Sequence, residues 1–264
     1  MKKTILLLLT LVMLHACKTV PITGRRQMAL IPAGQMNSMS FDNYKQVLNE
    51  SRVDRTSEEA QMVARVGAKI SRAVERYLQE NKASERIEGF DWEFKLIIDE
   101  TVNAWCMPGG KVAFYTGIMP ICADEAGVAV VMGHEVAHAI AAHGNERMTQ
   151  GLAQQLGGMG LAVALKDKPA ETQAIFMGAY GAASTVGAIL PFSRLHESEA
   201  DEMGLIFMAM AGYDPREAPK FWQRMNAQGG ARPPAFLSTH PSPEQRIQKL
   251  NANMPKALEY YSGQ

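Results

Sequence analysis

The chain has 264 residues, of which 47% are hydrophobic and 20% are charged. This composition supports a substantial buried core and excludes a disordered chain, a collagen-like repeat and a disulfide-rich miniprotein. The 27 basic and 27 acidic side chains give a formal net charge of zero. A balanced chain has no electrostatic reason to bind nucleic acid, so nucleic acid is excluded as a partner. The three cysteines, an odd number, need a separate explanation.

The first 16 residues have the pattern of a secretory signal peptide. Two lysines precede an apolar run over residues 5–14, which is too short to span a bilayer of about 30 Å. The run ends in Leu14-His15-Ala16-Cys17, which resembles a bacterial lipobox, although a histidine stands where a small or apolar residue is usual. We therefore predict cleavage of residues 1–16 and lipidation of Cys17. An ordinary cleaved signal with an incidental cysteine is the alternative.

Cleavage before Cys17 changes the charge and the cysteine count. It removes Lys2 and Lys3 and leaves 25 basic and 27 acidic side chains, a formal charge of −2. A chain with this charge is not attracted to an anionic membrane, so acyl chains on Cys17 must anchor it there. The membrane is thus the expected partner of Cys17. We expect a lipoprotein of the bacterial cell envelope that faces the periplasm from the outer membrane. Cys106 and Cys122 can pair in an oxidising compartment, but we favour two small buried apolar residues.

Hydrophobic periodicity predicts helices and strands after an irregular tether over residues 17–35. Apolar residues recur at spacings of three and four over residues 57–78, which predicts an amphipathic helix of about six turns. Residues 91–98 alternate between polar and apolar and predict a strand. Residues 103–115 predict a β-hairpin with its turn at Met107-Pro108-Gly109-Gly110.

The rest of the chain is predicted to be mostly helical. No internal repeat or long linker interrupts it, so residues 36–264 are expected to form a single α+β domain.

The most specific motif is His134-Glu135-Val136-Ala137-His138, an HExxH sequence behind the apolar stretch 126–132. Such a stretch places the helix in the protein interior. Histidines at i and i+4 project from one helix face, so both imidazoles can bind one Zn²⁺. Glu135 lies beside them, where it can act as the catalytic base on a metal-bound water. Two ordinary core histidines are the alternative, but three buried titratable groups on one apolar helix are costly without a metal.

A catalytic zinc takes a third protein ligand and keeps one position for water. Glu197 and Asp201 are four residues apart and therefore share one helix face. We expect Glu197 to bind the metal and Asp201 to hydrogen-bond a ligating imidazole from behind. Glu199 points about 200° away from Glu197 and is the alternative ligand. A solvated acidic turn is a further alternative, against which the apolar residues 205–208 argue.

These motifs resemble the zinc metalloprotease family of the CaaX prenyl proteases and HtpX, and within it most closely the periplasmic lipoprotein branch. The resemblance covers essentially the whole chain after residue 16. It rests on HExxH and on the ExxAD segment that follows some sixty residues later. Other matching segments, in chain order, are Pro21-Ile22-Thr23-Gly24-Arg25-Arg26-Gln27, Asn103-Ala104, Pro108-Gly109-Gly110, Tyr115-Thr116-Gly117, and Ser238-Thr239-His240-Pro241-Ser242 with Arg246.

The resemblance implies a mainly helical zincin-type metalloprotease domain, with a small mixed sheet or hairpin beside the HExxH helix and a cleft across the zinc. It implies a zinc endopeptidase with one Zn²⁺ per chain, whose substrates are unfolded, misassembled or stalled envelope proteins. The segment containing Asn103 and Ala104 resembles the family's edge strand, which would pair with the substrate backbone. An ordinary hairpin is the alternative for that segment.

The remaining histidines have several interpretations. His240 resembles a histidine that, in the lipoprotein branch, approaches the zinc and occludes it. It can alternatively stabilise the oxyanion, or it can be a turn residue before a helix. His143 and His196 flank the motifs and are interpreted as structural or surface residues.

Two alternatives concern the chain as a whole. Residues 174–192 contain no charged residue, and we favour a buried or mobile helical lid near the active site over a membrane span. A lid that faces the membrane is also consistent with a lipid tether. The alternative function is a lipoprotein assembly or chaperone factor with latent or no protease activity, against which the intact glutamate of HExxH argues.

Overall fold

The computed structural model describes residues 17–228, 236 and 243–263. Helices dominate, accompanied by a four-stranded and a two-stranded sheet, so the predicted α+β class is confirmed. Six of the helical segments are α2 (Ala33–Glu50), η1 (Ser84–Ile87), η2 (Thr116–Ile118), α4 (Met119–Cys122), α9 (Glu217–Ala227) and α11 (Pro243–Leu258). The other helices and the strands are described below.

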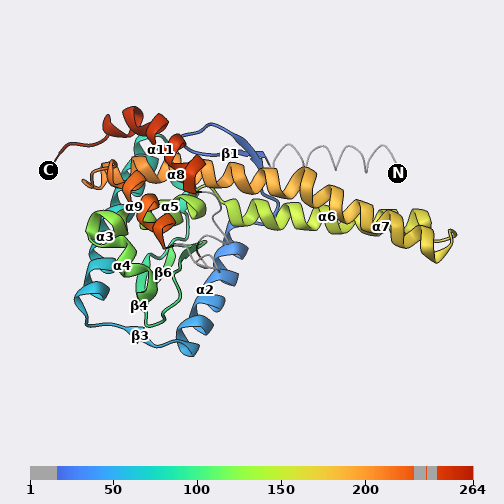
Figure 1. Ribbon diagram of the computed structural model, residues 1–264, viewed down its shortest axis with the longest axis horizontal. Helices are drawn as coiled ribbons and strands as arrows, with labels where there is room; N and C mark the ends of the chain where they lie inside the picture. The colour runs from blue at the N-terminus through green and yellow to red at the C-terminus, as the bar shows by residue number, and fades with distance from the viewer. Residues whose placement is uncertain (1–16, 229–235, 237–242, 264) are drawn as a thin grey trace.

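The predicted amphipathic helix is confirmed as α3 (Glu58–Glu80). Its first turn is capped by Ser57, whose hydroxyl accepts a hydrogen bond of 3.1 Å from the amide of Ala60. The apolar stripe that the spacing predicted is buried, including Val63, Val66 and Ile70. This face lies against α5 (Glu125–Ile140), the buried central helix of the molecule (Figure 1).

The four-stranded sheet has the order β3 (Val53–Asp54), β4 (Glu93–Ile97), β6 (Lys111–Tyr115) and β5 (Ala104–Met107). The predicted strand and the predicted hairpin are therefore confirmed. Strands β5 and β6 are antiparallel, with Trp105 opposite Ala113. Gly109 and Gly110 in the turn have φ angles of 84° and 82°, a conformation that favours glycine. Strand β5 is the outer strand of the sheet, and its neighbours outside the sheet are α5 and, to a lesser extent, α2.

The prediction of irregular structure for residues 17–35 is wrong. Strands β1 (Cys17–Thr19) and β2 (Arg26–Met28) form an antiparallel hairpin, and α2 begins at Ala33. The proline and glycine that suggested a loop belong to the turn of this hairpin. Ile22 and Gly24 have φ angles of 69° and 70°, and the amide of Val20 donates to the carbonyl of Arg25 at 2.8 Å.

Helix α8 (Leu190–Met210) crosses α5 at two glycines. A Cβ atom at Gly133 would lie 2.8 Å from the carbonyl oxygen of Gly204, and one at Gly204 would lie 2.9 Å from the backbone nitrogen of His134. These distances are shorter than real Cβ contacts allow, so only glycine permits this approach. The crossing brings the HExxH helix and the helix of Glu197 together.

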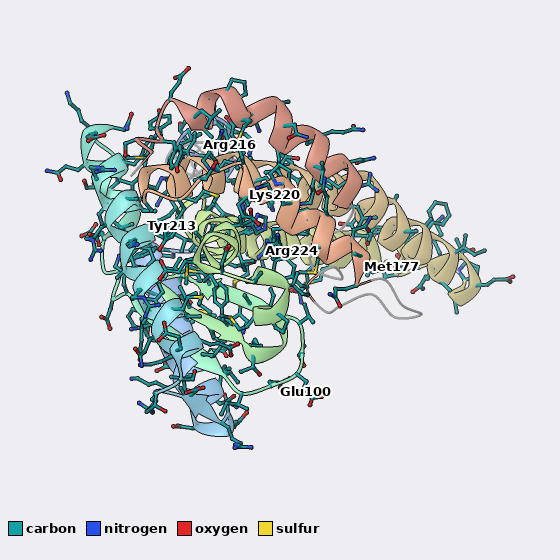
Figure 2. The ribbon with its side chains drawn as sticks, turned by 60° about the vertical axis from the view of Figure 1, so that its left-hand side comes forward. Glu100, Met177, Tyr213, Arg216, Lys220 and Arg224 are labelled. Atoms are coloured by element: carbon teal, nitrogen blue, oxygen red, sulfur yellow. The ribbon has the colours of Figure 1, made fainter. Side chains whose placement is uncertain are left out.

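The uncharged residues 174–192 belong to an exposed helical arm, so the buried form of the expected buried or mobile lid is wrong. Helices α6 (His143–Leu165) and α7 (Ala170–Ser184) run together away from the body, at the right of Figure 1, and η3 (Thr185–Ile189) leads back into α8. Side chains of this arm extend into solvent around Met177 in Figure 2. None of the described side chains of α7 is buried. The predicted helical character is confirmed.

Among the described residues, no single helix is both long and apolar enough to cross a membrane. The neighbouring segments Thr116–Cys122 and Glu125–Ile140 are together long and apolar enough, but the chain bends by 119° between them.

Cys106 and Cys122 are free thiols, and Cys122 is buried. Burial of Cys122 agrees with the interpretation as a small buried apolar residue, whereas Cys106 is only half-buried.

Candidate metal centre

Three potential metal ligands converge where α5 and α8 cross. His134 and His138 lie one turn apart on α5, and Glu197 faces them from α8. One ligand atom from each residue lies within 4.8 Å of the other two, and all three side chains are buried. The Nε2 atoms of the two imidazoles are 3.1 Å apart, and the Glu197 carboxylate lies 3.5 Å from His134 and 3.3 Å from His138.

These separations fit a zinc ion. Zinc–nitrogen bonds of about 2.0–2.1 Å in tetrahedral geometry place ligand atoms about 3.3–3.4 Å apart. The distances of 3.1 to 3.5 Å among the two imidazole Nε2 atoms and the two carboxylate oxygens of Glu197 are close to that spacing. Two imidazoles and one carboxylate also form the ligand set of many catalytic zinc sites.

Each imidazole is held by a second residue at its other nitrogen. His134 Nδ1 lies 3.0 Å from Oδ1 of Asp201, which is the contact predicted for this aspartate. His138 Nδ1 lies 2.8 Å from Nδ1 of His143. Contacts of this kind fix the ring orientation and direct Nε2 toward the metal position.

Arg246 on α11 joins the two acidic residues of α8. Its Nε donates to Asp201 at 2.8 Å, and its Nη1 donates to Glu197 at 3.2 Å. The guanidinium carbon lies 3.6 Å from the ring centre of Trp222. Burial raises the pKa of Asp201, but Arg246 and His134 outweigh this effect and hold the pKa below its ordinary value. The sequence placed Arg246 among matching positions and assigned it no role.

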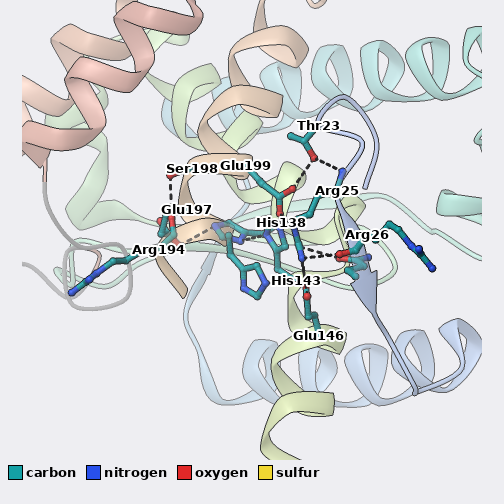
Figure 3. A network of polar contacts seen from close by, with 12 residues as sticks. Thr23, Arg25, Arg26, His138, His143, Glu146, Arg194, Glu197, Ser198 and Glu199 are labelled. Atoms are coloured by element: carbon teal, nitrogen blue, oxygen red, sulfur yellow. Dashed lines mark hydrogen bonds and ion pairs between the residues drawn. The ribbon is translucent and has the colours of Figure 1, made fainter. Parts of the chain in front are cut away.

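A second buried network lies behind His143 (Figure 3). His143 Nε2 is 3.2 Å from Glu199, and His196 Nε2 is 2.9 Å from Glu146. Arg25 from the β1–β2 turn joins the two glutamates: its Nε donates to Glu199 at 2.7 Å, and its Nη1 and Nη2 donate to Glu146 at 2.8 and 2.6 Å.

This network decides three of the sequence interpretations. His143 and His196 are completely buried, so they are structural and not surface residues. Glu199 is occupied by His143, Thr23 and Arg25 and is not part of the cluster of potential metal ligands. The sequence did not predict the role of Arg25, although the segment that contains it was one of the matching motifs.

A hollow in the surface links the metal position to the edge strand. Its lining includes Asn103 just before β5 and Ala104 at the start of β5, together with Glu135, His138 and Glu197. An extended chain in this hollow would lie between the outer edge of the sheet and the potential metal ligands. His240 lies outside the described residues.

Removing the charge of Glu146 is expected to reduce stability in a pH-dependent way. Burial raises the pKa of Glu146, but hydrogen bonds from Arg25 and His196 outweigh it and lower the pKa to about 2. The ionised group therefore stabilises the fold above the unfolded pKa, and this stabilisation is lost as the pH falls from about 4.5 to about 2. Glu146→Gln should cost roughly 2–4 kcal/mol at pH 7 and little at pH 2.

Urea denaturation of wild type and Glu146→Gln across that pH range measures the difference between their free energies of unfolding. Acid that removes the metal does so from both proteins, so this effect cancels in the difference. The exposed Glu59→Gln serves as the control and should show no such trend. A difference that stays constant with pH would contradict the ion-pair assignment.

Gly204→Ala is expected to weaken metal binding because it separates α5 from α8. The new methyl group would press on the backbone of Gly133 and His134. We expect metal affinity to fall about 10–100-fold, as for other changes behind the ligands, with a stability loss of about 1–3 kcal/mol. Gly160→Ala is the matched control, since nothing lies within 4 Å of a Cβ atom there. Competition with a chromogenic chelator measures the affinity, and equal values for the two variants would refute the steric argument.

Two imidazoles one turn apart, a carboxylate from a second helix and an adjacent glutamate define a zinc metallopeptidase type of centre. Residues 64–254 match the model of peptidase family M48. The chain therefore belongs to peptidase family M48, a family of zinc metalloproteases, and zinc is the metal that the site holds.

Several known proteins are similar to this chain. It is 35% identical to the mitochondrial metalloendopeptidase OMA1 of Schizosaccharomyces pombe over 240 residues, which are 90% of this chain and 66% of that protein. It is 28% identical to the human metalloendopeptidase OMA1 over 248 residues, 90% of this chain and 46% of that protein. The beta-barrel assembly-enhancing protease of Escherichia coli is 29% identical over 165 residues, 59% of this chain and 33% of that protein.

The chain spans 44% to 66% of the length of the OMA1 proteins from Schizosaccharomyces pombe, Arabidopsis thaliana, Saccharomyces cerevisiae and human. The predicted resemblance to a family of zinc metalloproteases is confirmed by the match to family M48, whereas the relatives named above are OMA1 peptidases and a beta-barrel assembly-enhancing protease rather than CaaX prenyl proteases or HtpX.

Proposed function

We propose that this chain is a membrane-tethered zinc metalloendopeptidase that hydrolyses peptide bonds in misfolded or stalled envelope proteins. One observation carries the proposal: His134, His138 and Glu197 converge beside a hollow that is lined by His138, Glu197 and Glu135 and bordered by the edge strand β5. The site thus combines a place for the metal, a base and a place for an extended substrate.

The roles of the residues follow from their positions. His134, His138 and Glu197 would hold the ion, and bound zinc would polarise the scissile carbonyl and lower the pKa of a water molecule toward about 7. Glu135 would accept the proton of the attacking water and deliver it to the leaving amine. Asp201 would keep His134 oriented through the contact at its Nδ1.

The edge strand favours unfolded substrates. Residues Asn103 and Ala104 lie where β5 begins and line the hollow next to Glu135. A substrate that adds to the outer edge of β5 must present an extended backbone, because strand addition uses main-chain hydrogen bonds. Misfolded or stalled proteins expose such segments, whereas folded proteins have already paired theirs.

The proposed location rests on the N-terminal pattern. Cleavage of residues 1–16 would leave Cys17 as the lipid-bearing first residue of a periplasmic outer-membrane lipoprotein, followed by the β1–β2 hairpin and one peptidase domain over residues 36–264. This location is consistent with similarity to a bacterial beta-barrel assembly-enhancing protease.

Metal removal and return test the proposed activity. Treatment with 1,10-phenanthroline should abolish casein cleavage, and stoichiometric zinc should restore it, whereas magnesium should not, because the site offers nitrogen ligands. Cleavage that continues in a preparation shown to be free of zinc would overturn the proposal.

The proposal also assigns His240 a role in controlling the centre. His240→Ala distinguishes the two forms of that role by casein cleavage. A rise in rate identifies a residue that blocks the resting site, and a fall in rate identifies one that stabilises the oxyanion. An unchanged rate would remove His240 from the proposal.

A further inference from the structure

The outer face of α6 carries a stripe of exposed apolar side chains. The stripe consists of Met148, Leu152, Leu156, Met159 and Val163. Their spacings of four, four, three and four residues keep them within an arc of about 80° on one side of the helix. Their exposed fractions rise from 42% at Met148 to 68% at Val163, so the stripe opens toward the tip of the arm.

The opposite face of α6 is the one that packs on α7. The ring of Tyr180 on α7 lies against Gly157 and Gly158, and its hydroxyl donates to the carbonyl of Gln154 at 2.9 Å. These contacts leave the stripe without a protein partner among the described residues. Residues 149–165 also contain no charged side chain, and the exposed polar group next to the stripe is the uncharged amide of Gln155, about 20° from its edge.

The start of the described chain lies at the base of the same helix. Cys17 is paired with Met28 in the β1–β2 hairpin. The amides of Leu30 and Ile31, which follow this hairpin, donate to Thr149 and Asn145 of α6 at 3.1 and 3.2 Å. A lipid on Cys17 would therefore bring the base of the arm to the membrane surface.

We propose that the stripe on α6 docks on the lipid bilayer, with its side chains in the boundary between headgroups and acyl chains. This inference rests on the proposed function only for the tether at Cys17. The charged residues at the tip are Lys166, Asp167, Lys168 and Glu171, which balance one another. Binding should therefore depend on apolar contact and be insensitive to salt and to anionic lipid.

Docking would also orient the metal centre. Helix α6 begins at His143, which contacts the potential ligand His138, and Arg147 on its first turns lines the hollow with the edge strand. An arm that lies on the bilayer would hold this hollow at a fixed distance from the membrane surface, where envelope proteins arrive in an unfolded state.

A fluorescent label on the arm tests this proposal in the full chain. A nitrobenzoxadiazole group is attached to Met159→Cys on the stripe and, as the matched position, to Ala153→Cys on the flank of the same helix. With phosphatidylcholine vesicles at saturating concentration, the fluorescence emission of the label at 159 should shift to shorter wavelength. Quenching of this emission by iodide should largely disappear. The label at 153 should change little, and labelling of a chain without an added cysteine gives the background.

Variants identify the responsible surface. Leu156→Glu combined with Val163→Glu should abolish the shift at 159, whereas Ala164→Glu, off the stripe, should preserve it. Glutamate in the boundary region should weaken vesicle binding about tenfold or more. A label at 159 that stays open to iodide with vesicles would overturn the proposal. Protection without vesicles, together with dimers in sedimentation, would overturn it in favour of a second copy on the stripe.

The tether is measured separately, by vesicle flotation of the chain with and without Cys17→Ser. The label at 159 is read in both chains at saturating vesicle concentration, so the arm is tested whether or not the anchor forms. Casein cleavage reports on the proposed peptidase activity independently of both.

Discussion

Glu135→Gln is expected to abolish peptide hydrolysis while zinc remains bound. The glutamine keeps the size of the side chain but cannot accept the proton of the attacking water. The metal would be held by His134, His138 and Glu197, whose ligand atoms converge without Glu135. Loss of a general base typically reduces the rate about 10²–10⁴-fold, so casein cleavage should fall by that factor.

Zinc content and casein cleavage are measured on the same preparations of wild type and variant. Glu59→Gln, an exposed glutamate on α3, is the matched control and should retain both. Cleavage by Glu135→Gln at the wild-type rate would contradict the assignment of the base. Loss of zinc from the variant would instead assign Glu135 to metal binding.

Arg246→Ala is expected to cause a large loss of stability. Its guanidinium is buried between Asp201 and Glu197 and stacks on Trp222. Removing it leaves two buried carboxylates without their shared cation, and breaking a buried pair in this way costs about 3–5 kcal/mol. Arg246→Lys should recover only part of this, because an ammonium group cannot bridge both carboxylates in the same plane.

Urea denaturation of the zinc-loaded proteins measures the loss. Arg216→Ala removes an exposed ion pair with Asp214 and should change stability by less than about 1 kcal/mol. If Arg246→Ala were as stable as the Arg216→Ala control, the buried arginine would not hold the carboxylates together.

Local spacing in the sequence was sufficient to predict the principal elements and the residues that converge at the candidate metal centre. HExxH places two imidazoles on one face of a helix whatever surrounds it, and the four-residue spacing does the same for Glu197 and Asp201. The apolar spacing over residues 57–78, which predicted α3, and the glycines that predicted the β5–β6 turn are local signals of the same kind. The structure brings these residues together across the crossing of α5 and α8.

Contacts between distant segments could not be predicted in this way. Arg25 is 121 residues from Glu146 and 174 residues from Glu199, and no local pattern connects them. The close approach of Gly133 and Gly204 likewise depends on how two helices cross. Of the two forms expected for residues 174–192, a buried or a mobile lid, the buried form is wrong, because the composition of an uncharged helix does not specify whether other parts of the protein cover it.

Anomalous diffraction at the zinc absorption edge, from crystals of protein that cleaves casein, tests the central claim most directly. We expect one zinc peak per chain, about 2.0–2.2 Å from Nε2 of His134, Nε2 of His138 and a carboxylate oxygen of Glu197. Absence of a peak at this position, or a zinc ion bound by Glu199 or His143 in the active protein, would contradict the proposed centre.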